Sequence, residues 1–124
     1  TPMLTAASLD VPMAFETLKQ AGSELGTGAI IVMDENTCMV EAARRMTKFF
    51  AHESCGRCTP CRVGCQQLLK GIEKVKKGEA KSTYLTELMK LADSMKIAAK
   101  CGLGQSVGNA FKSIVGNFRE EIIY

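Results

Sequence analysis

The chain has 124 residues, enough for one ordinary domain, or for one small domain with a fragment of a neighbour. A hydrophobic content of 46% and a charged content of 23% are typical of a globular protein and exclude a long disordered chain. The formal net charge is +3, and the basic residues are spread along predicted helix faces, unlike the basic patch of a nucleic-acid-binding domain. We assign no partner to these lysines, which are Lys70, Lys74, Lys76, Lys77, Lys81, Lys90, Lys96 and Lys100.

No apolar run approaches the roughly 20 residues that span a bilayer, and no charged-then-apolar leader opens the chain. We therefore expect a cytoplasmic protein without direct membrane insertion. In that reducing compartment, the six cysteines are expected to bind metal or to serve redox chemistry rather than to form a disulfide framework. The first residue is Thr1, which suggests a processed chain or a piece of a longer one.

Residues 1–36 differ from the rest because proline and glycine interrupt them repeatedly. A short amphipathic piece contains Phe15 and Leu18. Residues 29–33 form an apolar, largely β-branched run between a glycine and an aspartate, which predicts a strand. A single strand is not stable alone, so this one would have to pair with strands that the chain does not show plainly.

After residue 36 the hydrophobic period becomes helical, and the first two of four predicted helices flank a cysteine-rich loop. The first runs over 37–51 with Asn36 or Thr37 as its N-cap. The second has Thr59 as its N-cap, is followed by a proline in the first helical position, and stops at Gly78.

Two further helices complete the predicted bundle. The third is capped by Ser82 and ends near Lys100, and a glycine-bearing loop at 101–104 follows it. Four helices joined by short loops, with few aromatic residues and no Trp, favour a compact helical bundle. The last helix has the clearest apolar stripe, formed by Val107, Phe111, Ile114, Val115, Phe118 and Ile122.

Three thiols in the loop before the second helix indicate an iron-sulfur site. Cys55, Cys58 and Cys61 are separated by two residues each, and the intervening glycine and proline let a short loop curl around one side of a cluster. A cubane cluster offers one iron to each ligand, so a fourth ligand must come from elsewhere. Cys65 and Cys101 are the two candidates.

The spacing that includes Cys65 matches the bacterial ferredoxin run, yet Gln66 stands where a ferredoxin has proline. In two-cluster ferredoxins that fourth cysteine serves the other cluster, so the local triplet still takes a remote ligand. Cys65 also falls on the apolar face of its helix, which favours a small buried thiol. Cys101 is better placed, in the turn before the last helix, where one end of a bundle can bring it back to the triplet.

Other polar residues near the triplet also have two interpretations each. The N-terminus of the second helix, together with Arg57 and Arg62, would favour negative charge at the cluster, although both arginines fit simple solvent exposure equally well. Cys38 lies at a helix start, where a thiolate is stabilised, but a packed thiol beside Met39 is the favoured interpretation.

A zinc site is the main alternative metal centre. His52 precedes the triplet by three residues, so His52, Cys55, Cys58 and Cys61 are a conceivable ligand set. Zinc modules usually pair two such arms across a longer loop, which disfavours this interpretation. A dithiol oxidoreductase is weaker still, because its C-x-x-C motif follows a strand and here the motif follows a helix.

The sequence resembles the C-terminal cluster domain of the flavin-containing NADH-oxidising subunit of respiratory complex I, NAD-linked hydrogenases and formate dehydrogenases, and electron-bifurcating relatives. The resemblance covers essentially the whole chain. It is carried by His-Glu-Ser-Cys-Gly-Arg-Cys-Thr-Pro-Cys-Arg-Val-Gly at 52–64 and Cys-Gly-Leu-Gly at 101–104. Upstream, Leu-Gly-Thr-Gly at 25–28 and Ile-Val-Met-Asp-Glu at 31–35 resemble the end of a small β-grasp domain.

The resemblance implies a mostly α fold, with residues 1–36 as the tail of a β-grasp domain and 37–124 as a four-helix domain holding one 4Fe-4S cluster. It implies that the cluster ligands are Cys55, Cys58, Cys61 and Cys101. The family binds FMN and NADH in a larger N-terminal region with a glycine-rich loop, and no such loop exists in these 124 residues. The position of Cys65 departs from the residue that the family pattern leads us to expect.

The function expected from these observations is one-electron relay. Hydride from NADH would reach FMN elsewhere, and the cluster would pass electrons singly toward further iron-sulfur centres of a multi-subunit oxidoreductase, or in the reverse direction. The expected partners are the flavin- and NADH-binding portion or subunit and other iron-sulfur subunits. The alternatives are a structural zinc module that organises an assembly and an independent ferredoxin-like carrier.

Overall fold

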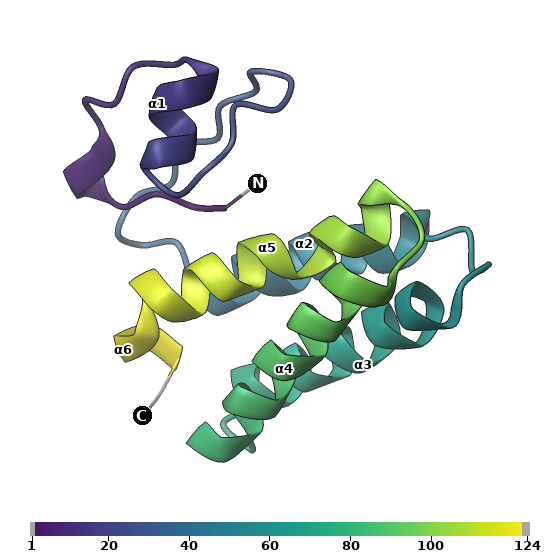
Figure 1. The fold of residues 1–124 in the computed structure, drawn as a ribbon. Helices are drawn as coiled ribbons and strands as arrows, with labels where there is room; N and C mark the ends of the chain where they lie inside the picture. Colours follow the sequence, from purple (N-terminus) through teal and green to yellow (C-terminus); the bar gives the residue numbers. More distant parts are fainter. Residues whose placement is uncertain (1, 123–124) are drawn as a thin grey trace.

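The computed structural model describes residues 2–122, and within them every regular element is a helix (Figure 1). Residues 1–36 supply only two short pieces, and the four long helices follow. No helix in the described part of the chain is both long and apolar enough to cross a membrane. In chain order the elements are the 3-10 turn η1 (Ala6–Ser8), α1 (Phe15–Gln20), α2 (Met39–Glu53), α3 (Thr59–Lys76), α4 (Ser82–Ala98), α5 (Gly102–Asn117) and α6 (Arg119–Ile122).

The long helices pack as the predicted bundle. Helix α2 lies against α3 and α5, and α4 lies against the same two helices, so the four surround one apolar core. Short loops between antiparallel neighbours force this arrangement, because each helix must bury its apolar stripe against the next. The largest side chains that are almost fully buried are Leu68, Ile72, Met95, Ile114, Val107 and Val115.

Helices α4 and α5 approach closely because Gly108 faces Ala92. A Cβ atom built on Gly108 would lie 2.5 Å from the Ala92 Cβ, closer than two such atoms can approach. Neither residue offers a flexible side chain that could move aside. Small residues on both helices therefore set the distance between them.

The predicted strand at 29–33 is wrong. These residues have no regular secondary structure, and no strand is present in residues 2–122. The side chains of Ile30, Ile31 and Val32 are 68%, 73% and 84% exposed. β-Branched composition favours a strand only where a neighbouring strand completes the hydrogen-bond ladder, and the described residues supply none.

Three predicted helix starts shift by one to two residues. Asn36 and Thr37, the two predicted N-caps of α2, belong instead to the turn before it. The Asp34 carboxylate accepts hydrogen bonds from the Asn36 N–H at 3.0 Å and from the Thr37 hydroxyl at 3.2 Å. The N-cap is Cys38 instead. In α3 and α4 the predicted caps, Thr59 and Ser82, are the first helical residues.

The predicted helix ends are closer to the structure. Gly78 follows α3 with φ +76°, a conformation that favours glycine, and its N–H donates to the Val75 carbonyl. The last predicted helix begins earlier, at Gly102, and is interrupted at Phe118, whose φ of −126° and ψ of 37° separate α5 from α6.

The N-terminal segment is held on helix α5. The Met3 N–H donates to Ser113 Oγ at 2.8 Å, and Asn117 Nδ2 donates to the Met3 carbonyl at 3.1 Å. The Ser23 hydroxyl donates to the Pro2 carbonyl at 2.7 Å, which draws the end of α1 toward the same segment. Residues from both ends of the described chain therefore lie together, away from the cysteine loop (Figure 1).

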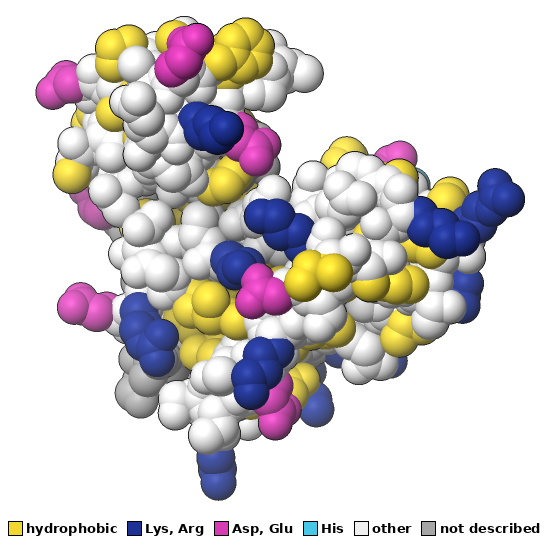
Figure 2. Space-filling view, in the orientation of Figure 1, with side chains coloured by type: hydrophobic (Ala, Val, Ile, Leu, Met, Phe, Trp, Pro, Cys, Tyr) yellow, Lys and Arg dark blue, Asp and Glu magenta, His cyan; other side chains and the backbone are white. Residues whose placement is uncertain are grey.

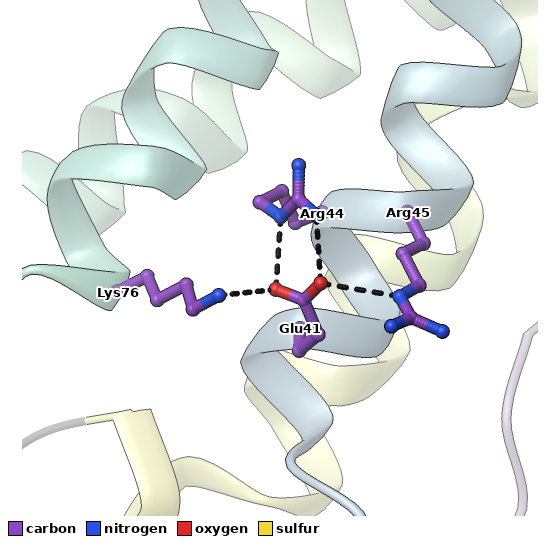
Figure 3. Close-up of polar contacts among 4 residues, drawn as sticks. All are labelled: Glu41, Arg44, Arg45 and Lys76. Atoms are coloured by element: carbon purple, nitrogen blue, oxygen red, sulfur yellow. Dashed lines mark hydrogen bonds and ion pairs between the residues drawn. The ribbon is translucent and has the colours of Figure 1, made fainter.

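A charged cluster joins α2 to α3 around Glu41 (Figure 3). Its carboxylate accepts two hydrogen bonds from the Arg44 guanidinium at 2.7 and 2.8 Å, one from Arg45 at 3.1 Å and one from Lys76 at 2.6 Å. Arg44, and then Lys76, hold the pKa of Glu41 far below its usual value of 4.5. Glu41 also lies in the first turn of α2, where the helix dipole favours negative charge.

Replacing Glu41 with Gln is expected to lower the stability of the chain at neutral pH and to make it less sensitive to acid. Because the folded-state pKa is depressed, Glu41 contributes stability that is present above the usual carboxyl pKa of 4.5 and is lost as the pH falls toward the folded-state value. Urea midpoints of parent and Glu41→Gln, measured from neutral to acid pH, should therefore converge. Glu87→Gln, on an exposed position of α4, is the matched control. A stability gap that does not depend on pH would contradict this account.

Candidate metal centre

The cysteine loop is a sharp turn between α2 and α3. Helix α2 ends at Glu53, Gly56 takes φ +75°, and α3 begins after Cys58, its N-cap. The positive φ is one that glycine adopts readily, which explains a glycine between the first two thiols of the triplet. Cys55 is exposed, Cys58 is half-buried and Cys61 is buried in the first turn of α3.

The turn that carries Cys101 lies beside this loop, at the same end of the bundle (Figure 1). Cys101 is exposed and is the N-cap of α5. A backbone hydrogen bond from Lys100 to the Cys58 thiol, followed by one from Cys61, lowers the pKa of Cys58. The backbone of Lys100, in the turn before α5, therefore lies near the Cys58 thiol.

A second contact joins the first turns of α3 and α5 at Gly104. A Cβ atom on Gly104 would lie 2.6 Å from the Ala99 Cβ, 3.0 Å from the Cys61 Cβ and 3.3 Å from the Cys61 Sγ. Any larger side chain at this position would push the turn away from Cys61. The glycine thus keeps the residues around Cys101 close to the triplet.

The donors at this end fit an iron-sulfur cluster by their chemistry. They are one thiol in the loop, Cys55, and three at the starts of two helices, where backbone N–H groups and the positive dipole ends stabilise thiolates. Thiolate ligands select iron-sulfur clusters, zinc or copper(I). Among residues 2–122, no three Cys, His, Asp or Glu side chains converge as ligands of a single metal ion do. A cluster takes its ligands around a larger core, one thiolate to each iron.

Cys65 is a buried thiol in the core, as its position on the apolar face of the helix predicted. Its side chain is 1% exposed, and its Sγ lies 3.8 Å from the Cys61 Sγ. Burial, and then the hydrogen bond with Cys61, raises the pKa of Cys65 to about 12. At neutral pH Cys65 is therefore a protonated thiol beneath Cys61.

The interpretation of Cys38 as a packed thiol is wrong. Cys38 is exposed at the N-cap of α2, whereas the adjacent Met39 is 6% exposed. The helix begins at Met39, two residues after the predicted start at 37, and Met39 enters the core while Cys38 remains at the surface. The turn formed by Asp34 causes this shift.

His52 and the two arginines lie at the surface near the loop. The His52 side chain is 85% exposed, and its Nδ1 lies 3.3 Å from the Glu53 Oε1. Arg57 is exposed. The Arg62 guanidinium donates to the Gly56 carbonyl at 2.7 Å and to the Thr59 Oγ1 at 3.3 Å, so Arg62 braces the cysteine loop.

Basic side chains are present at this end of the molecule. Figure 2 shows Lys and Arg side chains at the end that carries the cysteine loop and over the rest of the helices, where Asp and Glu side chains are interspersed among them. Positive charge around a group of thiolates lowers the electrostatic free energy of placing several negative charges close together.

Sequence reasoning missed Ser54. Its Oγ lies 3.2 Å from the Cys61 Sγ and accepts a hydrogen bond from the Gly56 N–H at 3.3 Å. A serine hydroxyl that accepts an N–H two residues further along is a recognised turn motif, so a serine directly before Cys-Gly carried a signal for the turn. The contact with Cys61 has no such local signal, because it depends on how α3 leaves the loop.

Comparison with known proteins places the chain in a family. Residues 41–124 match the family model described as "NADH-ubiquinone oxidoreductase-F iron-sulfur binding region". The F subunit of the NADH-quinone oxidoreductase of Mycobacterium tuberculosis (strain H37Rv) is 42% identical over 123 residues, which cover 99% of this chain and 28% of that protein. Its counterpart in Streptomyces coelicolor is 42% identical over 121 residues and is covered to 27%. The chain thus spans little more than a quarter of the length of these relatives.

A solved structure gives the same result for the fold. One chain of an NAD+-reducing NiFe hydrogenase in the air-oxidised state is 36% identical, with a TM-score of 0.82 over 95% of this chain and 20% of that one. Because the family model matches residues 41–124, more than half of the chain, this chain belongs to the family of the NADH-ubiquinone oxidoreductase-F iron-sulfur binding region.

Proposed function

We propose that this chain holds one 4Fe-4S cluster on Cys55, Cys58, Cys61 and Cys101 and relays single electrons within an NADH-oxidising or NAD-reducing oxidoreductase. The family supports an iron-sulfur site in this region. The observation that carries the choice of ligands is the close packing of the first turn of α5 on the triplet, where a Cβ atom on Gly104 would lie 3.0 Å from the Cys61 Cβ and 3.3 Å from the Cys61 Sγ. Cys65, the alternative fourth ligand, lies in the core beneath Cys61.

The residues of the chain serve three purposes at this site. The N-termini of α3 and α5 stabilise thiolates through their dipoles, and Arg62 braces the loop that presents them. The buried face of α3 excludes water from one side, since Cys61 and Cys65 on that face are 5% and 1% exposed. A bound cluster would supply one-electron redox chemistry, which the side chains of the protein lack.

The flavin and nicotinamide chemistry belongs to other parts of the assembly. The relatives that this chain resembles include NADH-quinone oxidoreductase and NAD+-reducing hydrogenase subunits, and the chain covers less than a third of each. We place FMN and NAD(H) on the flavin-binding portion or subunit, and we propose further iron-sulfur subunits as redox partners in the cytoplasm. Residues 1–36 would form the end of the β-grasp domain next to that portion.

Anaerobic reconstitution with iron and sulfide tests this function. The expected product is a brown chain with iron and sulfide in equal amounts, about four of each, whose visible absorbance is bleached by dithionite and whose reduced form gives an EPR signal. A colourless chain that purifies with zinc and takes up no sulfide would instead support the structural zinc module.

A further inference from the structure

The Cys61 sulfur has a hydroxyl neighbour that no ligand assignment includes. Ser54 immediately follows α2, and its Oγ lies 3.2 Å from the Cys61 Sγ in the first turn of α3. Ser54 is half-buried, and Cys61 is 5% exposed. The short loop between α2 and α3 therefore folds back so that its first residue meets the last thiol of the triplet.

The direction of this hydrogen bond follows from the other partner of Ser54. The Gly56 N–H can only donate, so the Ser54 Oγ accepts that bond at 3.3 Å. The hydroxyl proton remains free to point elsewhere. A cysteine that binds iron is a thiolate and has no proton to give, so the hydroxyl of Ser54 must donate to the Cys61 sulfur.

We propose that Ser54 is a positioning residue that raises the reduction potential of the cluster by donating this hydrogen bond to the Cys61 sulfur. The proposal rests on the function proposed above, in which Cys61 is a ligand. A donor to a ligand sulfur stabilises the reduced state more than the oxidised state, because reduction places more negative charge on the sulfurs.

Water cannot easily replace the hydroxyl if it is removed. The Cys61 side chain is enclosed by Gly104, where a Cβ atom would lie 3.3 Å from its Sγ, and by Cys65, whose Sγ lies 3.8 Å away. Removing the Ser54 hydroxyl should therefore leave the sulfur with one donor fewer. This predicts a shift in potential without loss of the thiolate itself.

The test is a redox titration of the reconstituted full chain, followed by EPR. Ser54→Ala is expected to shift the reduction equilibrium constant of the cluster about tenfold toward the oxidised state, which corresponds to about 59 mV for one electron. Ser54→Thr, which keeps the hydroxyl, should retain the parent potential. Ser54→Val has nearly the shape of threonine without the hydroxyl, and should shift the potential as Ser54→Ala does. Ser82→Ala, at the far end of α4, is the control for a serine-to-alanine change.

The outcomes separate this proposal from the function on which it rests. A parent chain that assembles no cluster overturns both. Variants that bind iron and sulfide like the parent but keep its potential overturn the role of Ser54 alone. Equal shifts for Ser54→Thr and Ser54→Val also overturn it, because they would trace the effect to the shape of the loop. If Ser54→Ala takes up no iron, the comparison of threonine with valine still decides the question.

Discussion

Replacing Cys101 with Ser is expected to reduce the iron content of the reconstituted chain by at least about tenfold, because loss of a ligand should cost no less than the 10–100-fold typical of losing a group that only supports a ligand. Cys101 is exposed at the N-cap of α5, where a serine can take its place without disturbing the core. The folded bundle should therefore persist while the site loses its fourth thiolate. Iron and sulfide analysis, with EPR of the reduced protein, measures the effect.

Two matched substitutions control this experiment. Cys65→Ser should keep near-parental iron, because the Cys65 thiol lies in the core and not among the proposed ligands. Cys38→Ser should also keep it, because Cys38 is exposed at the start of α2, away from the loop. If Cys65→Ser loses the cluster and Cys101→Ser retains it, the ferredoxin-like ligand set is correct and our assignment fails.

Replacing Ile114 with Ala is expected to destabilise the chain by about 2–5 kcal/mol, the range for truncating a large aliphatic side chain in a core. Ile114 lies in α5 and is 0% exposed, within the core shared by the four long helices. Truncation loses the transfer free energy of the removed methylene and methyl groups and leaves a cavity that the surrounding helices cannot close fully. Urea unfolding of parent and variant at matched iron content measures the change.

The matched control is Ile97→Ala, the same substitution in helix α4 at a side chain that is 87% exposed. Its effect should stay within about 0.5 kcal/mol, as is usual for surface positions. Both substitutions change helix propensity equally, so the difference between them reports burial alone. Similar losses of stability in the two variants would show that Ile114 is not held in a rigid core.

Local pattern predicted the helices well and their first residues less well. The apolar stripe that contains Leu68, Ile72 and Val75 is buried in α3 as expected. The N-caps were displaced because serine, threonine and asparagine compete for the same backbone N–H groups in turns and in caps. Asp34, for example, takes the Thr37 hydroxyl into a turn and leaves Cys38 at the cap.

The strand failed for a different reason. Residues 29–33 have strand composition, and that composition cannot supply the neighbouring strand that a ladder requires. The exposed side chains of Ile30, Ile31 and Val32 show that the described chain does not cover this segment. The composition of residues 29–33 alone therefore could not show whether a second strand lies beside them.

By itself, the sequence determined the chemistry of the site and the helical class of the fold. The spacing of Cys55, Cys58 and Cys61 and the helical period of the apolar residues are local properties, so they can be read without knowing the fold. Only the tertiary structure decided which distant turn meets the triplet and that Ser54 contacts Cys61. Those contacts depend on the packing of α3 against α5 through Gly104, and the distance between packed helices is a property of both partners together.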